Sequence, residues 1–251
     1  MDWAILILIT FFAASVQSAT GFGFGLIAVS AFLILLNSAA AIQLVIIITL
    51  ATSCIHWFKL KQDIPANLLK WLSLGCLVGF PIGLFIYLEL NLEILKISIA
   101  LLIILISLQN AWLLFQQKRQ NNAKSIHPIN SKFNQKALMG VGIASGAMAS
   151  SLAMPGPAVM LYLSRTSLSK DEIRGTILTF FIFSYGGALL LQAGLVGISL
   201  ETWKTAGLLI PAALVGVSVG HLISHRINQQ TFKALVLVIL MLTGIFMLLN
   251  L

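Results

Sequence analysis

The sequence predicts an all-α polytopic membrane protein, in which two inverted repeats each contain a broken, re-entrant helical hairpin and three transmembrane helices. Composition is the first reason, because 59% of the 251 residues are hydrophobic and only 9% are charged, against about 25% charged residues in soluble domains. The second reason is that uncharged segments recur at lengths near the ~20 residues that cross a bilayer as a helix. The third is a short motif that returns in the second half of the chain.

Single transmembrane helices are predicted for residues 39–58, 66–88 and 93–116 in the first half and 175–193, 204–223 and 231–250 in the second. Each half begins with a further apolar segment, residues 2–36 and 137–163. One transmembrane domain is therefore expected. It divides into a first inverted repeat (1–116), a cytoplasmic linker (117–135) and a second inverted repeat (136–251).

The repeated motif occurs in the second predicted span of each half. The letters LVGFPIG at 77–83 match LVGVSVG at 214–220, and the same spacing aligns Lys96 with Lys233. A match of this kind predicts a duplicated architecture, in which the leading segments of the two halves also correspond.

Loop charge predicts how the halves are oriented. If each leading segment enters and leaves on the same side, only Lys96 and Lys204 lie outside, and every other Lys and Arg lies in the cytoplasm. If each leading segment is instead a single crossing, most of this bias disappears, so the hairpin arrangement is favoured. It gives each half an odd number of crossings, hence inverted halves, and places the N- and C-termini on the external face.

The first hairpin carries glycines at every second position in ATGFGFGLIAV, residues 19–29. Gly21, Gly23 and Gly25 each weaken a helix by roughly 1 kcal/mol relative to alanine. One interpretation is a tight helix-packing face, but such faces repeat every four residues. The spacing of two favours a helix break at the turn, where glycine adopts positive φ and lets a ligand approach the backbone.

The second hairpin carries a counterpart in Pro155-Gly156-Pro157. Proline interrupts a continuing helix but suits the first positions of a new one. Two equal arms cut from residues 137–163 would each be roughly 20 Å long, shorter than the ~30 Å hydrocarbon core. This hairpin is therefore expected to turn near mid-membrane and to meet the first break there.

A small anion is the guest that such a site favours. Helix N-termini carry about half a positive charge and unpaired N–H donors, and no acidic residue lies near either break. Gln17, Ser18, Thr20, Ser150 and Ser151 add neutral polar groups near the breaks. The competing interpretation of these five side chains is hydrogen bonding between helices.

Two further candidates come from aligning the first turns of equivalent spans, which pairs Gln43 with Arg174. Arg174 follows the second hairpin directly, so it could draw an anion toward the breaks. The alternative is an ordinary anchor at the cytoplasmic membrane surface.

Other classes of function are disfavoured. The basic residues lie in short loops between apolar segments, so nucleic-acid binding is not expected despite the net charge of +8. No His, Asp and Glu constellation lies in the spans, and Cys54 and Cys76 lack metal-type spacing. We expect no enzyme, no metal site and no cofactor. An anion channel remains an alternative, although a channel should line a continuous polar path.

The letters GFGFGLIAV at 21–29 and PGPAVMLYL at 155–163, with the duplication, resemble the TauE/SafE family of sulfite and organosulfonate exporters over the whole chain. The resemblance implies a secondary transporter in the bacterial inner membrane that exports sulfite or an organosulfonate such as sulfoacetate. Another small carboxylate or oxyanion is the alternative substrate. Expected partners are the anion, the lipid bilayer and, as a candidate, a second copy in a homodimer.

This sequence departs from the family pattern at two places. Ser30 stands where a proline often follows the glycine-rich run, and Met154-Pro155-Gly156-Pro157 replaces a glycine-rich repeat. The site therefore carries over more firmly to Gly21, Gly23, Gly25, Gly156 and Pro157 than to the neighbouring Ser and Thr residues.

Overall fold

The computed structural model describes residues 3–59, 64–89, 91–120, 134–163 and 170–224, together with the single positions 166, 168, 238, 241, 245 and 249. Every regular element in these residues is helical. Among them, four helices are long and apolar enough to cross a membrane: Trp3–Thr20, Ala66–Glu89, Glu172–Val196 and Leu200–Leu222. The prediction of an all-α polytopic membrane protein is confirmed.

The first half contains α1 (Trp3–Thr20), α2 (Phe24–Leu36), α3 (Ala40–Lys59), α4 (Ala66–Glu89) and α5 (Leu92–Gln120). The second contains α6 (Gln135–Leu152), α7 (Gly156–Leu163), α8 (Lys170–Leu191), a π-helical turn (Gln192–Val196) and α9 (Leu200–Ser224). These bounds match the predicted spans closely, but the π-helical turn was not predicted. The span expected at 231–250 lies almost wholly outside the described residues.

Both leading segments are broken where the glycines and prolines predict. The first hairpin leaves the helix between Thr20 and Phe24, with φ of 88° at Gly21 and 111° at Gly23. The second is broken between Leu152 and Gly156, and Ala153 there adopts φ of 52°, which is unusual for a residue with a Cβ. The Ala153 N–H donates to the Ala149 carbonyl at 3.2 Å and so caps the end of α6.

The second hairpin is less symmetric than the equal arms expected from its length. Its arms are α6, with 18 residues, and α7, with 8 residues. An α-helix of that shorter length spans roughly 12 Å, well short of the ~30 Å hydrocarbon core. The arms differ because the proline pair fixes the start of α7 late in the segment.

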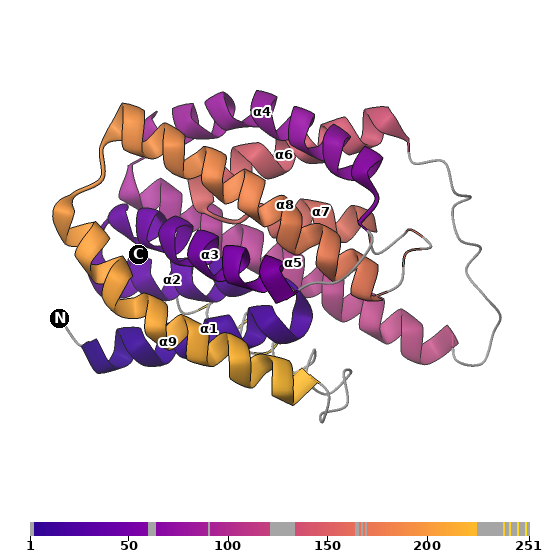
Figure 1. Ribbon diagram of the computed structural model, residues 1–251, viewed down its shortest axis with the longest axis horizontal. Helices are drawn as coiled ribbons and strands as arrows, with labels where there is room; N and C mark the ends of the chain where they lie inside the picture. Colours follow the sequence, from indigo (N-terminus) through magenta and orange to yellow (C-terminus); the bar gives the residue numbers. More distant parts are fainter. Residues whose placement is uncertain are drawn as a thin grey trace.

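The helices that precede the breaks pack on helices of the opposite half. Figure 1 shows α4 alongside α6 at one edge of the molecule and α9 alongside α1 at the other, with α3 and α8 packed together between these pairs. A Cβ added at Gly79 of α4 would collide with the carbonyl of Ile143, and one at Gly216 of α9 with the carbonyl of Phe11. Small residues therefore allow backbone-to-backbone contact in both pairs.

Serine hydroxyls reinforce the same two helix pairs. Ser18 of α1 donates to the carbonyl of Val217 at 2.7 Å, and Ser150 of α6 donates to the carbonyl of Phe80 at 2.9 Å. The spacing that aligns the repeated motif also pairs Phe80 with Val217. Each helix that leads into a break is thus bonded to the same aligned position of the repeated motif.

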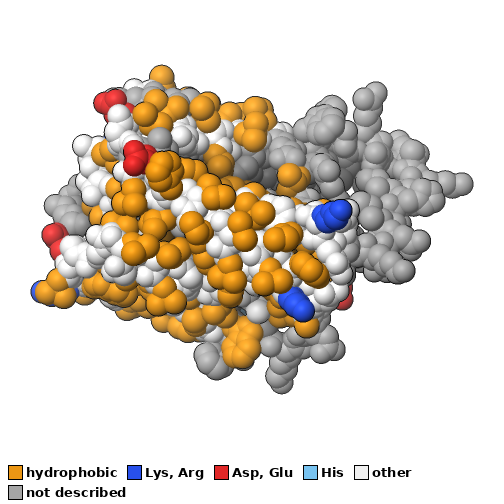
Figure 2. All heavy atoms as spheres, turned by 90° about the horizontal axis from the view of Figure 1, so that it is seen from above, with side chains coloured by type: hydrophobic (Ala, Val, Ile, Leu, Met, Phe, Trp, Pro, Cys, Tyr) orange, Lys and Arg blue, Asp and Glu red, His pale blue; other side chains and the backbone are white. Residues whose placement is uncertain are grey.

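The outer surface suits a lipid environment. Figure 2 shows a face covered mainly by hydrophobic side chains, with charged side chains toward its ends. Large apolar residues such as Leu105, Leu190 and Phe85 lie exposed on the helices. An apolar exterior of this extent is what a membrane-embedded protein presents to lipid.

Candidate functional site

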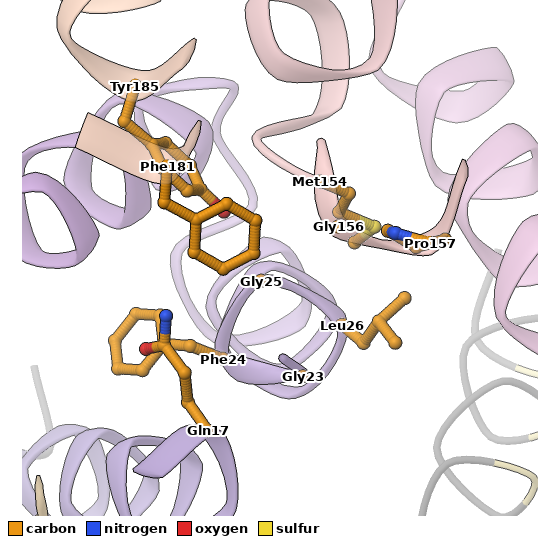
Figure 3. Close-up of a pocket in the computed structure, with 10 residues that line it drawn as sticks. All are labelled: Gln17, Gly23, Phe24, Gly25, Leu26, Met154, Gly156, Pro157, Phe181 and Tyr185. Atoms are coloured by element: carbon orange, nitrogen blue, oxygen red, sulfur yellow. The ribbon is translucent and has the colours of Figure 1, made fainter. Parts of the chain in front are cut away.

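A small cavity lies where the two helix breaks meet (Figure 3). Its lining comes from α1, from the starts of α2 and α7, and from α8: Gln17, Gly23, Phe24, Gly25, Leu26, Met154, Gly156, Pro157, Phe181 and Tyr185. The free volume is about 10 Å³, close to what one water molecule needs. A cavity of this volume is too small to hold a sulfite or sulfonate ion.

Two helix N-termini border this cavity. Gly23 is the N-cap of α2, and its carbonyl accepts the N–H of Ile27 at 3.1 Å. The first N–H groups of a helix have no acceptor within it, and in α2 they belong to cavity-lining residues. On the other side α7 begins at Gly156. The cavity therefore faces the positive ends of two helices that come from different halves of the chain.

The hairpins touch each other directly between Gly25 and Ala153. A Cβ added at Gly25 would collide with the carbonyl oxygen of Ala153, and it would lie 3.4 Å from the hydroxyl of Tyr185. That hydroxyl donates to the same Ala153 carbonyl at 2.9 Å. Tyr185 of α8 thus holds the turn before α7 while lying against the start of α2.

Phe181 forms the apolar wall beside this contact. Its ring meets the ring of Tyr185 edge-on, with centroids 5.4 Å apart and planes at 80°. A Cβ added at Gly156 would lie 3.0 Å from Cζ of Phe181. The aromatic pair therefore closes the cavity on the α8 side.

Gln17 supplies the polar side chain with unused hydrogen-bonding capacity. It is 1% exposed, and its Oε1 is buried without a hydrogen-bond partner in the described part of the chain. Figure 3 shows its carboxamide extending from α1 toward Phe24 and Phe181. A buried carbonyl oxygen without a partner is costly, so this atom is suited to receive a donor from a guest.

The structure brings together only part of the predicted site. Gln17, Gly23, Gly25, Gly156 and Pro157 line the cavity. The remaining candidates lie outside its lining: Thr20, Gly21, Gln43, Ser150, Ser151, Pro155 and Arg174.

The outlying polar candidates mostly serve local structure. The Thr20 hydroxyl donates to the Val16 carbonyl at 2.9 Å, and the Ser151 hydroxyl donates to the Ala147 carbonyl at 2.6 Å. Gln43 Nε2 donates to the carbonyl of Gly197, just after the π-helical turn, at 3.0 Å. Together with Ser150, which bonds α4, these contacts match the alternative of hydrogen bonding within and between helices.

Arg174 lies close to the first break although it does not line the cavity. A Cβ added at Gly21 would stand 3.4 Å from Cγ of Arg174. Arg174 also precedes Phe181 and Tyr185 on α8 at a spacing that places all three on one helix face, with Phe181 two turns away. Its side chain therefore lies beside the turn of the first hairpin, on the approach along α8.

Five lining residues were missed in the sequence. Phe24, Leu26 and Met154 flank the predicted breaks, so their positions gave a local signal. Phe181 and Tyr185 gave none, because aromatic residues inside an apolar span look alike whether they face lipid or a site. No group of His, Cys, Asp and Glu suited to a metal ion occurs in the described residues.

The comparison with protein families agrees with this architecture. A family model for the sulfite exporter TauE/SafE matches residues 6–247, nearly the whole chain. The chain belongs to the TauE/SafE family. TauE/SafE proteins are membrane transporters of the sulfite-exporter type. The broken hairpins therefore belong to a membrane transport protein. Neither the curated proteins nor the solved structures gave a significant match.

Proposed function

We propose that this TauE/SafE protein is a secondary transporter, not an enzyme, that exports a small anion by alternating access around the cavity between α2 and α7. Sulfite or an organosulfonate such as sulfoacetate is the proposed substrate. The observation that carries the proposal is the meeting of two helix N-termini in one cavity, whose described lining residues include Gln17 and no acidic side chain. Helix ends and neutral donors are a common way to bind anions in broken-helix transporters.

The energy of such a site suits transport. Each helix N-terminus favours an anion by about 0.3–1 kcal/mol, and by up to ~2 kcal/mol where the site is partly buried. Among the residues that the structure describes, no Lys or Arg side chain lines the cavity. The anion is therefore held weakly and exchanges rapidly, as a transported substrate must.

Loading the cavity requires movement of the hairpins. Its free volume of about 10 Å³ has to grow before an oxyanion fits. The contact between Gly25 and Ala153 closes it on one side and the Phe181–Tyr185 pair on another. Separation of α2 from α7, or rotation of the aromatic pair, is the proposed opening step.

The driving force we propose is the anion's own gradient together with the membrane potential. Export of one negative charge from a cell with a negative interior gains about 2.3 kcal/mol per 100 mV. Arg174, beside Gly21 near the start of α8, is proposed to raise the local anion concentration on the cytoplasmic side.

Duplication with inversion is part of the proposal, with repeats at 1–116 and 136–251 and a cytoplasmic linker between them. The paired contacts of Gly79 on α6 and Gly216 on α1 support it. So do the paired hydroxyl bonds of Ser18 and Ser150. Inverted halves would bring α2 and α7 to the cavity from opposite membrane faces.

Flux measured in proteoliposomes tests the proposed function. Proteoliposomes that contain the purified protein are loaded with sulfite, sulfoacetate, acetate or chloride, and a membrane potential is imposed. Protein-free liposomes measure the passive leak of each anion. We expect potential-dependent flux of at least one sulfur oxyanion that exceeds the flux of chloride. Transport of a neutral or cationic solute with no response to any of the four anions would refute the anion site.

A further inference from the structure

We propose that the cavity binds a singly charged oxyanion that carries a proton, such as hydrogen sulfite, and that Gln17 recognises this proton. The inference rests on the proposed anion transport and adds the charge state of the substrate. Two separate features of the cavity between α2 and α7 support the inference: the charge of its walls and the unpartnered oxygen of Gln17.

The positive charge of the cavity walls balances one negative charge. Two helix N-termini contribute about half a positive charge each, and none of the described lining side chains is charged. Arg174 lies beside Gly21, outside the lining. A doubly charged sulfite ion would therefore keep about one uncompensated negative charge in a buried site, where loss of hydration is severely unfavourable. A monoanion avoids this, so hydrogen sulfite is favoured over sulfoacetate, whose sulfonate and carboxylate together carry two negative charges near neutral pH.

Gln17 provides an acceptor that a bare anion cannot use. The Gln17 side chain is 1% exposed, and its Oε1 has no hydrogen-bond partner among the described residues. A carboxamide has both an acceptor oxygen and two N–H donors. The carboxamide oxygen can accept a hydrogen bond from the hydroxyl of hydrogen sulfite, while the NH2 group donates to a second oxygen of the same ion. These two hydrogen bonds can form with either orientation of the amide.

The other polar groups of the lining do not take this role. The Tyr185 hydroxyl already donates to the carbonyl of Ala153. The free N–H groups at the start of α2 are donors, which bind the charged oxygens. Within the described cavity lining, Gln17 Oε1 is the buried side-chain oxygen that lacks a partner.

Titration of the protein itself has to be separated from titration of the substrate. Among the described lining residues, Tyr185 is the titratable one. The other described titratable or charged groups on helices packed round the cavity are Glu172 and Arg174 on α8, Tyr162 on α7, Lys136 on α6, Cys54 on α3, and Glu201, Lys204 and His221 on α9. A reference substrate whose charge does not change near neutral pH corrects for all of them.

Methanesulfonate is that reference, because it stays a monoanion near neutral pH and has no acidic proton. The second ionisation of sulfurous acid falls near neutral pH. At constant total sulfite, we expect the sulfite flux of the wild-type protein to fall as pH rises, in proportion to the hydrogen sulfite that remains. The methanesulfonate flux should stay nearly level over the same range.

The variant Gln17→Met tests the recognition of the proton, since methionine keeps the length of the side chain and removes the carboxamide. We expect the sulfite flux at neutral pH to fall about tenfold relative to the methanesulfonate flux. The control is Gln192→Met. Gln192 is also fully buried with an unpartnered Oε1, but it bonds Ser150 and lies outside the cavity lining, so its substitution should leave the flux ratio unchanged.

The outcomes are distinct. A wild-type sulfite flux that stays level or rises with pH, after correction by methanesulfonate, overturns the monoanion inference. An unchanged flux ratio in Gln17→Met overturns the role of Gln17. Both results leave anion transport standing, whereas absence of any anion flux in the wild type refutes the proposed function itself. The wild-type pH profile decides the charge state even if Gln17→Met does not fold.

Discussion

Arg174 of α8 lies against Gly21 in the turn of the first hairpin, where an added Cβ would stand 3.4 Å from Cγ of the arginine. The contact joins the two halves of the chain at the first break, outside the cavity lining. Sequence reasoning left Arg174 as either a membrane-surface anchor or an anion-attracting residue. Its place beside the break, on the helix face that carries Phe181 and Tyr185, supports the second role.

Neutralising this charge should slow capture of the substrate. We expect Arg174→Gln to lower anion flux about tenfold at low substrate concentration and much less at saturation, because local anion concentration falls when a positive potential is removed. Initial rates over a range of sulfite or sulfoacetate concentrations, at low and at high salt, measure the effect.

Lys136→Gln is the matched control. Lys136 lies in the first turn of α6, on the same predicted side of the membrane; it is exposed and does not line the cavity. Its loss should change flux by less than about twofold. Equal effects of the two substitutions would reduce Arg174 to an ordinary surface charge.

A single methyl group should obstruct the cavity. In Gly156→Ala the new Cβ lies 3.0 Å from Cζ of Phe181, and the end of this side chain can shift to make room. Gly156 is not one of the described glycines with positive φ, so alanine fits its backbone conformation. The variant should therefore fold and insert normally, while flux falls about tenfold. Yield, thermal stability and proteoliposome flux measure these effects.

The comparison variant is Gly186→Ala, in which the same methyl meets only Cδ1 of Leu50 at 3.9 Å. This is ordinary van der Waals contact, so flux should be unchanged. If Gly156→Ala transports as well as Gly186→Ala, the cavity between the breaks is not on the substrate path.

Local chemistry explains which features were predictable. Glycine and proline act on their own backbone, so the breaks at Gly21–Gly23 and before Gly156 were predicted correctly. Ser150 was assigned to the site because it neighbours a break, yet it donates to Phe80 of another helix. Phe181 and Tyr185 were missed because their orientation depends on how α8 packs, which an apolar sequence does not reveal.

The paired serines offer a stability test of the duplicated packing. Ser18→Ala and Ser150→Ala each remove one hydroxyl bond to an aligned carbonyl. Both should destabilise the protein by similar amounts, on average about 0.6 kcal/mol and at most ~1.7 kcal/mol. Ser151→Ala, which loses a bond only within α6, should have a smaller effect. Unfolding in mixed micelles measures all three. Strongly unequal effects of Ser18→Ala and Ser150→Ala would count against equivalent roles.

Membrane orientation is tested in the linker. Its residue Ser125 lies outside the described residues, and the charge distribution predicts that it is cytoplasmic. With Cys54 and Cys76 replaced by alanine, Ser125→Cys should resist an impermeant thiol reagent added to intact cells and react after permeabilisation. Strong labelling from outside would reverse the predicted orientation and, with it, the external termini.

The hydroxyl of Tyr185 should position α7 for transport. It donates to the Ala153 carbonyl at 2.9 Å, in the turn before α7, and it faces the start of α2. Tyr185→Phe keeps the ring and its contact with Phe181, but leaves this buried carbonyl without its donor, which should lower stability by about 1 kcal/mol. We expect a larger effect on transport: the maximal rate falls about tenfold for every anion, because the two helix ends no longer hold their relative positions.

Tyr87→Phe provides the control, since Tyr87 makes a similar bond to the carbonyl of Ala39 at 3.3 Å and does not line the cavity. It should lower stability by a comparable amount and leave the maximal rate unchanged. If both variants lose stability and neither loses rate, the Tyr185 bond is structural, and the helix ends keep their positions without it.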